Sequence, residues 1–284
     1  MLIRIGFDIA FNVPAPTAMM LMLSTHPSRA RDIVRPEVLT VQPDVPIERF
    51  TDSFGNRCGR IVAPAGQLRL VSDGVMHDSG ELDEFNPSAK QIPVEQLPPE
   101  TLKFLLGSRY CEVDRLSEIA WNLFGGTPLG WPRVQAILDW VHSNVTFGYQ
   151  YARSTKTAYD VFVERQGVCR DFTHLSITLL RCMNIPARYS TGYLGDIGVP
   201  VSPAPMDFSA WLEAYLDGRW YTFDARHNVR RIGRIVMARG RDAADVALTT
   251  SFGQTQLTKF TVWTDEIKQE QVGMTARPGL LVGA

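Results

Sequence analysis

The first residues of the chain alternate between apolar and polar positions. Apolar side chains recur at every second position: Ile3, Ile5, Phe7, Ile9 and Phe11. This is the period of a strand with one buried face. Further strand-like segments follow at 37–42, 57–63 and 67–76, separated by stretches rich in proline, glycine, asparagine and aspartate that favour turns. The region up to about residue 85 is therefore predicted to be all β, as a sandwich.

The hydrophobic period changes after a proline-rich stretch over residues 86–100. Proline lacks an amide donor and restricts the residue before it, so this stretch suits a boundary between domains. Beyond it, apolar residues recur at helical spacing over 113–123 and 134–141. We therefore predict two domains: an N-terminal all-β domain over 1–97 and a second domain over 98–284 that opens with two amphipathic helices.

A third helical segment, over 168–183, is apolar on so many sides that little of it can face water. It is predicted to be a central, buried helix. Three strands are predicted after it, over residues 187–194, 208–216 and 219–223. Asp217 and Gly218 join the last two strands, and this dipeptide suits a two-residue hairpin turn. A buried helix followed by an antiparallel sheet predicts an α+β fold.

Composition and charge narrow the class of protein. The chain has 284 residues, of which 45% are hydrophobic and 21% charged, as in a globular protein with a sizeable core. Its net charge of -1 argues against nucleic acid or an anionic membrane as a partner. The apolar run 18–23 is far shorter than the roughly 20 residues of a membrane-spanning helix. The N-terminus lacks the pattern of a secretory signal, so we expect a cytoplasmic protein. Nothing here indicates an oligomeric state.

Four cysteines are present, without any C-x-x-C pair: Cys58, Cys111, Cys169 and Cys182. This pattern predicts neither a disulfide framework nor a zinc site, in keeping with a reducing compartment. Cys169 falls at the first turn of the central helix, where unpaired amides and the helix dipole favour a thiolate. The alternative is that Cys169 is a small buried hydrophobic residue, which is how the other three cysteines are interpreted.

The predicted hairpin turn also sets the register of its two strands. Trp211 then opposes Asp224, and Ser209 opposes Arg226, because opposed residues keep a constant index sum. Ser209 and Asp224 become diagonal neighbours on one face of the sheet, within roughly 8 Å. Asp224 on its own is equally compatible with a turn residue.

Two sequence blocks resemble a known family. They read GVCRDFTHLSITLLRCMNIPARYSTGYL from residue 167 and FSAWLEAYLDGRWYTFDARHN from residue 208. They are similar to the core of the transglutaminase-like superfamily, papain-related thiol enzymes that include bacterial cysteine proteases. The resemblance covers about 139–246, and the β region before it is similar to the one that precedes this core in bacterial members. It implies a papain-like core. The papain signature C-G-[SA]-C-[WY] is absent.

The resemblance also implies roles for individual residues. Cys169 takes the position of the nucleophile, and Asp224 that of the acid that orients the base. The base itself is a histidine in an H-A-W motif, and this chain has Ser209 there, in Ser209-Ala210-Trp211. A serine hydroxyl cannot accept a thiol proton at neutral pH, so the usual triad is incomplete.

The histidines offer one replacement base. His227 lies three residues after Asp224, but in the hairpin register it opposes Phe208 and points to the core unless the strand ends before it. His174, five residues after Cys169, is expected to be a structural, hydrogen-bonded histidine, as the family's spacing suggests. The other histidines are expected to be solvated or capping side chains: His26, His77 and His142.

Six arginines lie at the end of the second block and in the residues after it: Arg226, Arg230, Arg231, Arg234, Arg239 and Arg241. They predict a basic patch. Such a patch is either a solvated face of the protein or a receptor for an acidic group of a substrate.

These features together predict a thiol hydrolase or acyltransferase that acts on amide bonds of a peptide or protein through a Cys169 thioester. The Cys169 backbone amide would hold part of the oxyanion, and no metal or organic cofactor is required. The alternative, favoured by Ser209, is a catalytically impaired pseudoenzyme that serves as a peptide- or protein-binding module. A third alternative is that Ser209 was introduced to disarm the protein.

Overall fold

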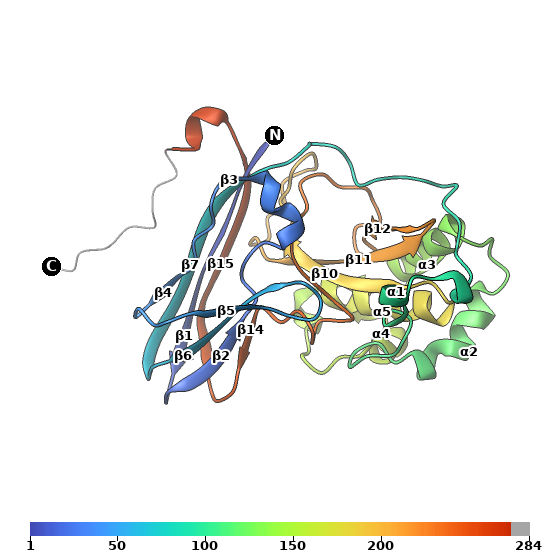
Figure 1. Ribbon diagram of the computed structural model, residues 1–284. Coiled ribbons are helices and arrows are strands. Elements are labelled where there is room, and N and C mark those ends of the chain that lie inside the picture. Colours follow the sequence, from blue (N-terminus) through green and yellow to red (C-terminus); the bar gives the residue numbers. More distant parts are fainter. Residues whose placement is uncertain (274–284) are drawn as a thin grey trace.

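The computed structural model describes residues 1–273 and shows a β sandwich beside a mixed helix-and-sheet core (Figure 1). One sandwich sheet has the order β15-β1-β7-β3, with β4 also paired to β7. Its strands are β1 (Leu2–Val13), β3 (Ile33–Arg35), β4 (Thr40–Gln42), β7 (Gly66–His77) and β15 (Gln256–Ile267). The other sheet has the order β14-β2-β6-β5, and its strands are β2 (Thr17–Leu21), β5 (Glu48–Thr51), β6 (Arg57–Ala63) and β14 (Thr249–Ser251).

The alternating residues of β1 form the centre of the sandwich, as predicted. Ile3, Ile5 and Phe7 are completely buried and belong to one apolar cluster with Met19 of β2 and Ile61 of β6. Because successive side chains of a strand point to opposite faces, this placement requires the two-residue period seen in the sequence.

Both ends of the chain contribute to the sandwich. β15 pairs with β1 over almost its full length, from Leu2↔Ile267 to Asn12↔Gln256, and β14 pairs with β2. Figure 1 shows this last long strand lying beside the first. Residues 249–267, which the sequence-based division grouped with the second domain, therefore lie in the sandwich sheets. The boundary near residue 97 stays a prediction.

The core has a sheet of order β12-β11-β10-β13 covered by helices on one face. The strands are β10 (Ala187–Tyr193), β11 (Ser209–Leu216), β12 (Arg219–Phe223) and β13 (Ile235–Gly240). The helices are α1 (Pro99–Leu102), α2 (Val113–Phe124), α3 (Trp131–Asn144), α4 (Ala158–Glu164) and α5 (Cys169–Cys182). Tyr193, Phe208 and Ile235 extend from this sheet into the apolar cluster of the sandwich. The α+β class is confirmed.

The remaining elements are short. They are the 3-10 helices η1 (Pro27–Asp32), η2 (Val94–Gln96), η3 (Tyr149–Tyr151) and η4 (Gln269–Gln271), and the parallel pair β8 (Thr146–Phe147) and β9 (Gln166–Gly167). No helix within residues 1–273 is long and apolar enough to cross a membrane.

Two sequence predictions in the core are confirmed. Every residue of α5 from Asp171 to Cys182 is buried, so this helix is central, with the other helices and the sheet packed around it. The hairpin turns at Asp217 and Gly218, whose φ angles of 50° and 83° are the positive values that a two-residue turn of this type requires. Leu216 pairs with Arg219 and Leu212 with Phe223, which is the predicted register.

One predicted strand is shorter than expected. Only Thr40–Gln42 of the segment 37–42 pairs with a neighbour. Glu37 instead turns its carboxylate to accept a hydrogen bond from the Thr25 hydroxyl at 2.6 Å. Glu37 is thus held by a side-chain contact with Thr25, and the backbone pairing with β7 begins only at Thr40. Two helices and eight strands were not predicted: α1, α4, β2, β3, β5, β8, β9, β13, β14 and β15.

Candidate active site

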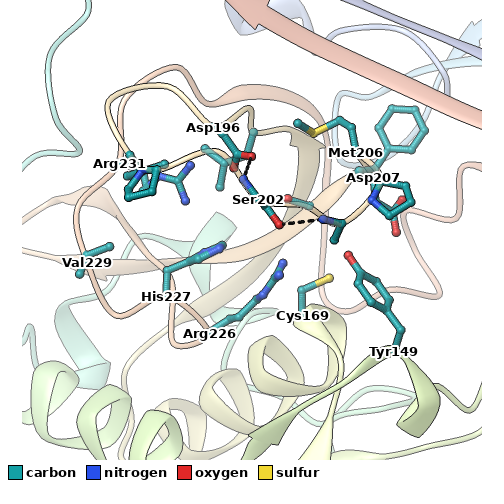
Figure 2. A pocket seen from close by; sticks show the side chains of 17 residues that line it. Tyr149, Cys169, Asp196, Ser202, Met206, Asp207, Arg226, His227, Val229 and Arg231 are labelled. Atoms are coloured by element: carbon teal, nitrogen blue, oxygen red, sulfur yellow. Dashed lines mark hydrogen bonds between the residues drawn. The ribbon is translucent and has the colours of Figure 1, made fainter.

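Cys169 is the first residue of α5, and its side chain opens into a pocket of about 360 Å³ (Figure 2). Two walls of this pocket come from distant parts of the chain. One is the loop after β10 together with Ser209, and the other is the turn after β12 with Arg226 and His227. The predicted nucleophile, the residue at the family's base position and the candidate replacement base therefore line one pocket.

The start of α5 is held by the residue two positions after Cys169. Asp171 is completely buried, and its carboxylate accepts a hydrogen bond from the Val168 amide at 2.9 Å. A Cβ on Gly167 would lie 2.6 Å from the Cβ of Asp171, so only glycine leaves room for this contact. The run Gly167-Val168-Cys169-Arg170-Asp171 thus defines where the helix begins and where the sulfur lies.

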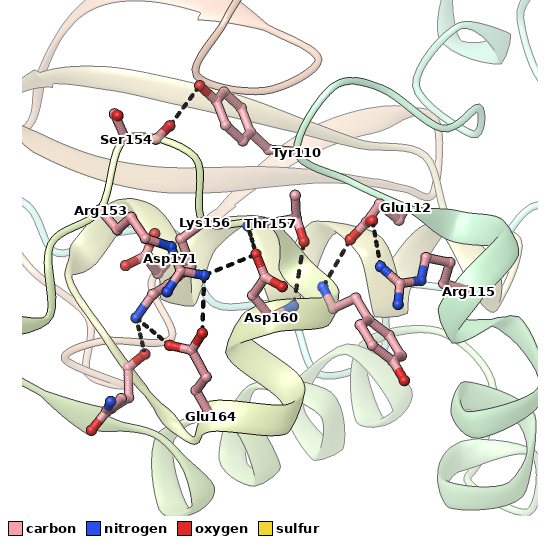
Figure 3. A network of polar contacts seen from close by, with 12 residues as sticks. Tyr110, Glu112, Arg115, Arg153, Ser154, Lys156, Thr157, Asp160, Glu164 and Asp171 are labelled. Carbon is pink, nitrogen blue, oxygen red and sulfur yellow. Dashed lines mark hydrogen bonds and ion pairs between the residues drawn. The ribbon is translucent and has the colours of Figure 1, made fainter.

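A polar network ties the segment before α5 to helix α4 (Figure 3). Lys156, only 1% exposed, pairs with Glu164 at 3.0 Å and donates to the Gln166 carbonyl at 3.0 Å. Arg153 pairs with Glu164 at 2.9 Å and with Asp160 at 3.1 Å. A buried charge is retained only when it is paired in this way, so these contacts hold the approach to Cys169 in one conformation.

The sheet side of the pocket is set by the first residues of β11. The backbone amide of Ala210 donates a hydrogen bond to the Cys169 sulfur. Ser209, next to it, lines the pocket, and its carbonyl accepts a hydrogen bond from the Thr191 hydroxyl at 3.1 Å. The serine that the resemblance aligns with the family's base therefore lines the same pocket as Cys169.

Strand β12 ends at Phe223, and this corrects the predicted register beyond that point. Asp224 accepts hydrogen bonds from the amides of Arg226 at 3.1 Å and His227 at 3.2 Å, which turns the chain sharply. The predicted ladder pairs of Trp211 with Asp224 and of Ser209 with Arg226 therefore do not form. The strand ends before His227, so this side chain faces the pocket instead of the core.

Asp224 and His227 are bonded to each other. Nδ1 of His227 lies 2.9 Å from Oδ2 of Asp224, and Arg234 donates to the same oxygen at 3.1 Å. Burial alone would raise the pKa of Asp224, but the His227 hydrogen bond and the Arg234 charge hold it well below its ordinary range. Asp224 is thus an ionised carboxylate with a hydrogen bond to the His227 imidazole.

Helix α3 supports the turn that carries His227. Nδ1 of His142 donates to the carbonyls of Ala225 and Arg226, both at 3.1 Å. Asn228, at the end of the turn, donates to Asp139 at 2.8 Å. From the sequence, His142 is expected to be a solvated or capping histidine. Its ring is exposed, but it binds the backbone of the turn, a contact that no local pattern indicates.

The pKa of Cys169 differs from the sequence-based expectation of a stabilised thiolate. Burial raises it from an ordinary 9.0 to about 11, while Arg226 and the Ala210 amide act in the lowering direction. A helix N-terminus contributes about 0.3–1 kcal/mol, which is less than one pKa unit at about 1.4 kcal/mol per unit. Desolvation therefore outweighs the helix end, and the resting form is the neutral thiol.

Two further pocket residues escaped the sequence analysis. Tyr149 follows the short strand β8, and its hydroxyl points toward the Cys169 side of the pocket (Figure 2). Asp207, two residues before Ser209, has a pKa raised by burial. Only its closeness in sequence to the SAW motif could have drawn attention to Asp207, and Tyr149 has no such signal.

The other histidines and cysteines lie away from this pocket. Nε2 of the buried His174 accepts the Ala243 amide at 3.1 Å, which confirms its structural role. His26 caps η1 through the Ser28 amide, and His77 is exposed. All four cysteines lie within residues 1–273 and are free, and three are buried: Cys58, Cys111 and Cys182. The same residues contain no cluster of three or more His, Cys, Asp or Glu arranged to hold a metal ion.

Comparisons with known proteins give the same relationship as the two sequence blocks. An uncharacterized protein of Mycobacterium leprae is 31% identical over 205 residues, which are 65% of this chain and 67% of that protein. An uncharacterized protein of Mycobacterium tuberculosis is 28% identical over 233 residues, covering 73% of each chain. The crystal structure titled "a Putative Cysteine Protease from Cytophaga hutchinsonii" is 32% identical, covers 95% of this chain and 91% of its own, and superposes with a TM-score of 0.82.

The family model described as the transglutaminase-like superfamily matches residues 123–225, a range that ends just after Asp224 and includes Cys169 and Ser209. With the Cytophaga structure similar over nearly its full length, sandwich included, the chain belongs to the transglutaminase-like superfamily.

Proposed function

We propose that the protein is a thiol hydrolase or acyltransferase that attacks an amide bond of a peptide or protein with the Cys169 sulfur. The observation behind this is that Cys169, at the helix start, opens into the same pocket as an imidazole held by a buried carboxylate. A nucleophile, a base and a group that orients the base are the parts that covalent acyl transfer needs. The name of the Cytophaga relative, "a Putative Cysteine Protease", agrees with the same reaction class.

His227 serves as the base in this proposal. Asp224 accepts a hydrogen bond from Nδ1, which leaves Nε2 without its proton and able to accept one. Nε2 takes the thiol proton of Cys169 while the sulfur bonds to the substrate carbonyl carbon. It then returns that proton to the nitrogen of the leaving amine as the C–N bond breaks. Water or a second amine releases the acyl group from sulfur by the reverse sequence of proton transfers.

The oxyanion that forms on the carbonyl oxygen needs hydrogen-bond donors. The backbone amide of Cys169 lies in the first turn of α5, where helix amides have no partner within the helix. We propose the Tyr149 hydroxyl as the second donor, because it points into the pocket beside the sulfur (Figure 2). Arg226 favours the thiolate electrostatically, since its positive charge acts to lower the Cys169 pKa.

The alternative is a pseudoenzyme that binds peptides or proteins without turning them over. Two observations favour it: Ser209 occupies the family's base position, and the pKa of the Cys169 thiol is raised to about 11. A thiol with that pKa is almost fully protonated at neutral pH unless a base accepts its proton in the reaction.

Trapping the acyl-enzyme separates the two functions. The protein is incubated with a mixture of peptides and peptide amides, quenched in acid and digested for mass spectrometry, and release of amine or ammonia is measured in parallel. An enzyme gives an acylated Cys169 peptide and turnover, both lost in Cys169→Ala. Cys182→Ala, which removes a buried thiol at the other end of the same helix, is the matched control and keeps both signals. Turnover that survives in Cys169→Ala, or binding without any acylation, contradicts the proposal.

A further inference from the structure

The six arginines of the basic patch, from Arg226 to Arg241, differ in whether they form an ion pair with a carboxylate. Three of the six pair with carboxylates: Arg234 with Asp83 and Asp224, Arg239 with Glu213, and Arg241 with Asp245. Arg230 is exposed and donates to the Asp83 carbonyl. Two remain, Arg226 and Arg231, and both line the Cys169 pocket. The sequence left two explanations for the patch, a solvated face or a receptor for an acidic group of a substrate. Arg226 and Arg231 line a pocket, so a solvated face does not describe them.

Arg231 is buried yet forms no ion pair with any residue from 1 to 273. It is 5% exposed, and within that range its guanidinium has one hydrogen bond, from Nη2 to the Gly195 carbonyl at 2.8 Å, while Nε is buried without a partner. Removing a guanidinium from water without a counter-charge is costly. A protein that retains such a group at the wall of a cavity gains from it only when an acceptor enters the cavity.

Arg226 presents a second positive charge on the same wall. Its guanidinium lies 3.8 Å from the centre of the Phe147 ring, again with no ion pair in the part of the chain that the structure describes. Figure 2 shows Arg226, His227 and Arg231 on one side of Cys169, with Tyr149 and Asp207 on the other. The aromatic contact orients the guanidinium and leaves its charge unneutralised.

Two acids also line the pocket, Asp196 and Asp207; Asp196 acts on Arg231 and Arg226 acts on Asp207 through their charges, but neither acid forms an ion pair with these arginines. Asp196 accepts a hydrogen bond from the Ser202 amide at 2.7 Å. Asp207 lies in surroundings that raise its pKa by burial, which favours its neutral form. The wall with the two arginines therefore remains the side of the pocket that attracts an anion.

We propose that this pocket selects substrates that place a carboxylate beside the amide bond attacked by Cys169, with Arg231 and Arg226 as the residues that bind the carboxylate. Planar guanidinium groups suit this ligand because they donate two parallel hydrogen bonds to it. The carboxylate comes from an acidic side chain or from a free C-terminus. The selection of substrates rests on the proposed function, whereas the anion preference of the pocket does not.

Alkylation of Cys169 tests the anion preference without any turnover. Iodoacetate and iodoacetamide both alkylate the thiolate, forming a C–S bond as iodide leaves. The two reagents differ only in that iodoacetate carries a carboxylate and iodoacetamide carries an amide. We expect the ratio of the iodoacetate rate to the iodoacetamide rate at Cys169 to fall about tenfold in Arg231→Met and in Arg226→Met. The reason is that each variant loses a hydrogen bond from a charged group to the carboxylate of iodoacetate. Arg230→Met, an exposed arginine outside this pocket, leaves the ratio unchanged. Equal ratios in the wild type and both pocket variants overturn the proposal.

Folding is monitored in the same samples, because Arg231 is buried. If Arg231→Met does not fold, Arg231→Lys, which keeps the charge and loses the planar fork, and the less buried Arg226→Met still test the proposal. The lysine variant is expected to retain a ratio between those of the wild type and Arg226→Met. If folded Arg226→Met has the same iodoacetate-to-iodoacetamide ratio as the wild type, the proposal that these arginines bind a carboxylate is overturned.

Matched substrates identify the source of the carboxylate. Peptides with Glu or Gln next to the scissile amide test the side chain, and peptides with a free or amidated C-terminus test the chain end. One acidic member is expected to have a kcat/KM about tenfold or more above its neutral partner, through KM, and to lose this advantage in Arg231→Met. Turnover without such a difference contradicts the selection. If no substrate is turned over but the iodoacetate-to-iodoacetamide ratio still falls in the arginine variants, only the proposed function is contradicted, and the anion preference of the pocket stands.

Discussion

Two buried carboxylates of the same hairpin have similar electrostatics and different partners. Glu213 on β11 lies between Arg188 and Arg239, with Nε of Arg239 at 3.1 Å from both oxygens. Asp224, just after β12, lies between Arg234 and His227. Burial acts to raise the pKa of both acids, and the neighbouring charges and hydrogen bonds lower both. Ionised carboxylates are thus maintained at both sites by the same physical effects.

The partner that completes each cluster distinguishes them. Both partners of Glu213 are guanidinium groups that stay charged at all accessible pH values, so this cluster exchanges no proton. His227 is an imidazole, 25% exposed, at the wall of the Cys169 pocket. A depressed acid pKa therefore does not by itself indicate function, because structural ion pairs produce it as well. The group that the acid orients, and the cavity that this group faces, separate the two clusters.

Removal of the imidazole is expected to have the largest effect. His227→Ala takes away the proposed base and leaves the fold intact, because the side chain is partly exposed. We expect kcat/KM to fall by about 10²–10⁴-fold, the usual contribution of a general base. His77→Ala, an exposed histidine far from the pocket, is the control and should retain full activity. Activity in His227→Ala within threefold of the wild type would exclude His227 as the base.

The Glu213 cluster should respond in stability and not in chemistry. Glu213→Gln leaves the partly buried Arg188 and Arg239 without their counter-charge, and we expect the free energy of unfolding to fall by about 2–4 kcal/mol, somewhat less than for a fully buried pair. Urea denaturation measures this, and kcat/KM of the folded variant should stay within about threefold. Glu48→Gln breaks an exposed pair with Arg60 and should cost less than about 1 kcal/mol. A large loss of activity in folded Glu213→Gln would remove the distinction between the clusters.

A histidine at the family's position should compensate for the loss of His227. In the double variant Ser209→His with His227→Ala, Asp224 has lost its imidazole partner and is available to a side chain on β11. We expect activity to recover about 10–100-fold over His227→Ala, since general acid–base catalysis is restored. The single variant Ser209→His should gain less, because Asp224 is then occupied. No recovery in a folded double variant would show that position 209 does not reach Asp224.

The smallest expected change concerns the thiol itself. Alkylation of Cys169 by iodoacetamide should rise with pH toward a midpoint near 11, where this partly buried thiol ionises. Because the folded-state pKa is raised, this thiol stabilises the fold below the ordinary thiol pKa, and that stabilisation is lost as the pH rises toward 11. Arg226→Met removes a charge that favours the thiolate, so the rate at pH 9 should fall about three- to tenfold. An unchanged rate would place Arg226 outside the electrostatic environment of the sulfur.

Local sequence patterns determined much of the architecture. The two-residue period of β1, the apolar surface of α5 and the Asp217-Gly218 turn each follow from neighbouring residues, and each is confirmed. The position of Cys169 at a helix start is of the same kind, since the Gly167 and Asp171 contacts that hold it lie within four positions. The resemblance to the family drew attention to Ser209, which stands where the family's H-A-W motif has its histidine.

Only the tertiary structure decided how these residues meet. His227 faces the pocket because Asp224 captures the amides of the next turn and because His142 of α3 holds the carbonyls of that turn, the latter contacts spanning more than 80 residues. Tyr149 reaches the same pocket from a distant segment, and β15 returns to β1 from the far end of the chain. The pKa of Cys169 rises because burial outweighs the helix end. Periodicity reports the conformation of neighbours, whereas burial, desolvation and charge are sums over groups that only folding brings together.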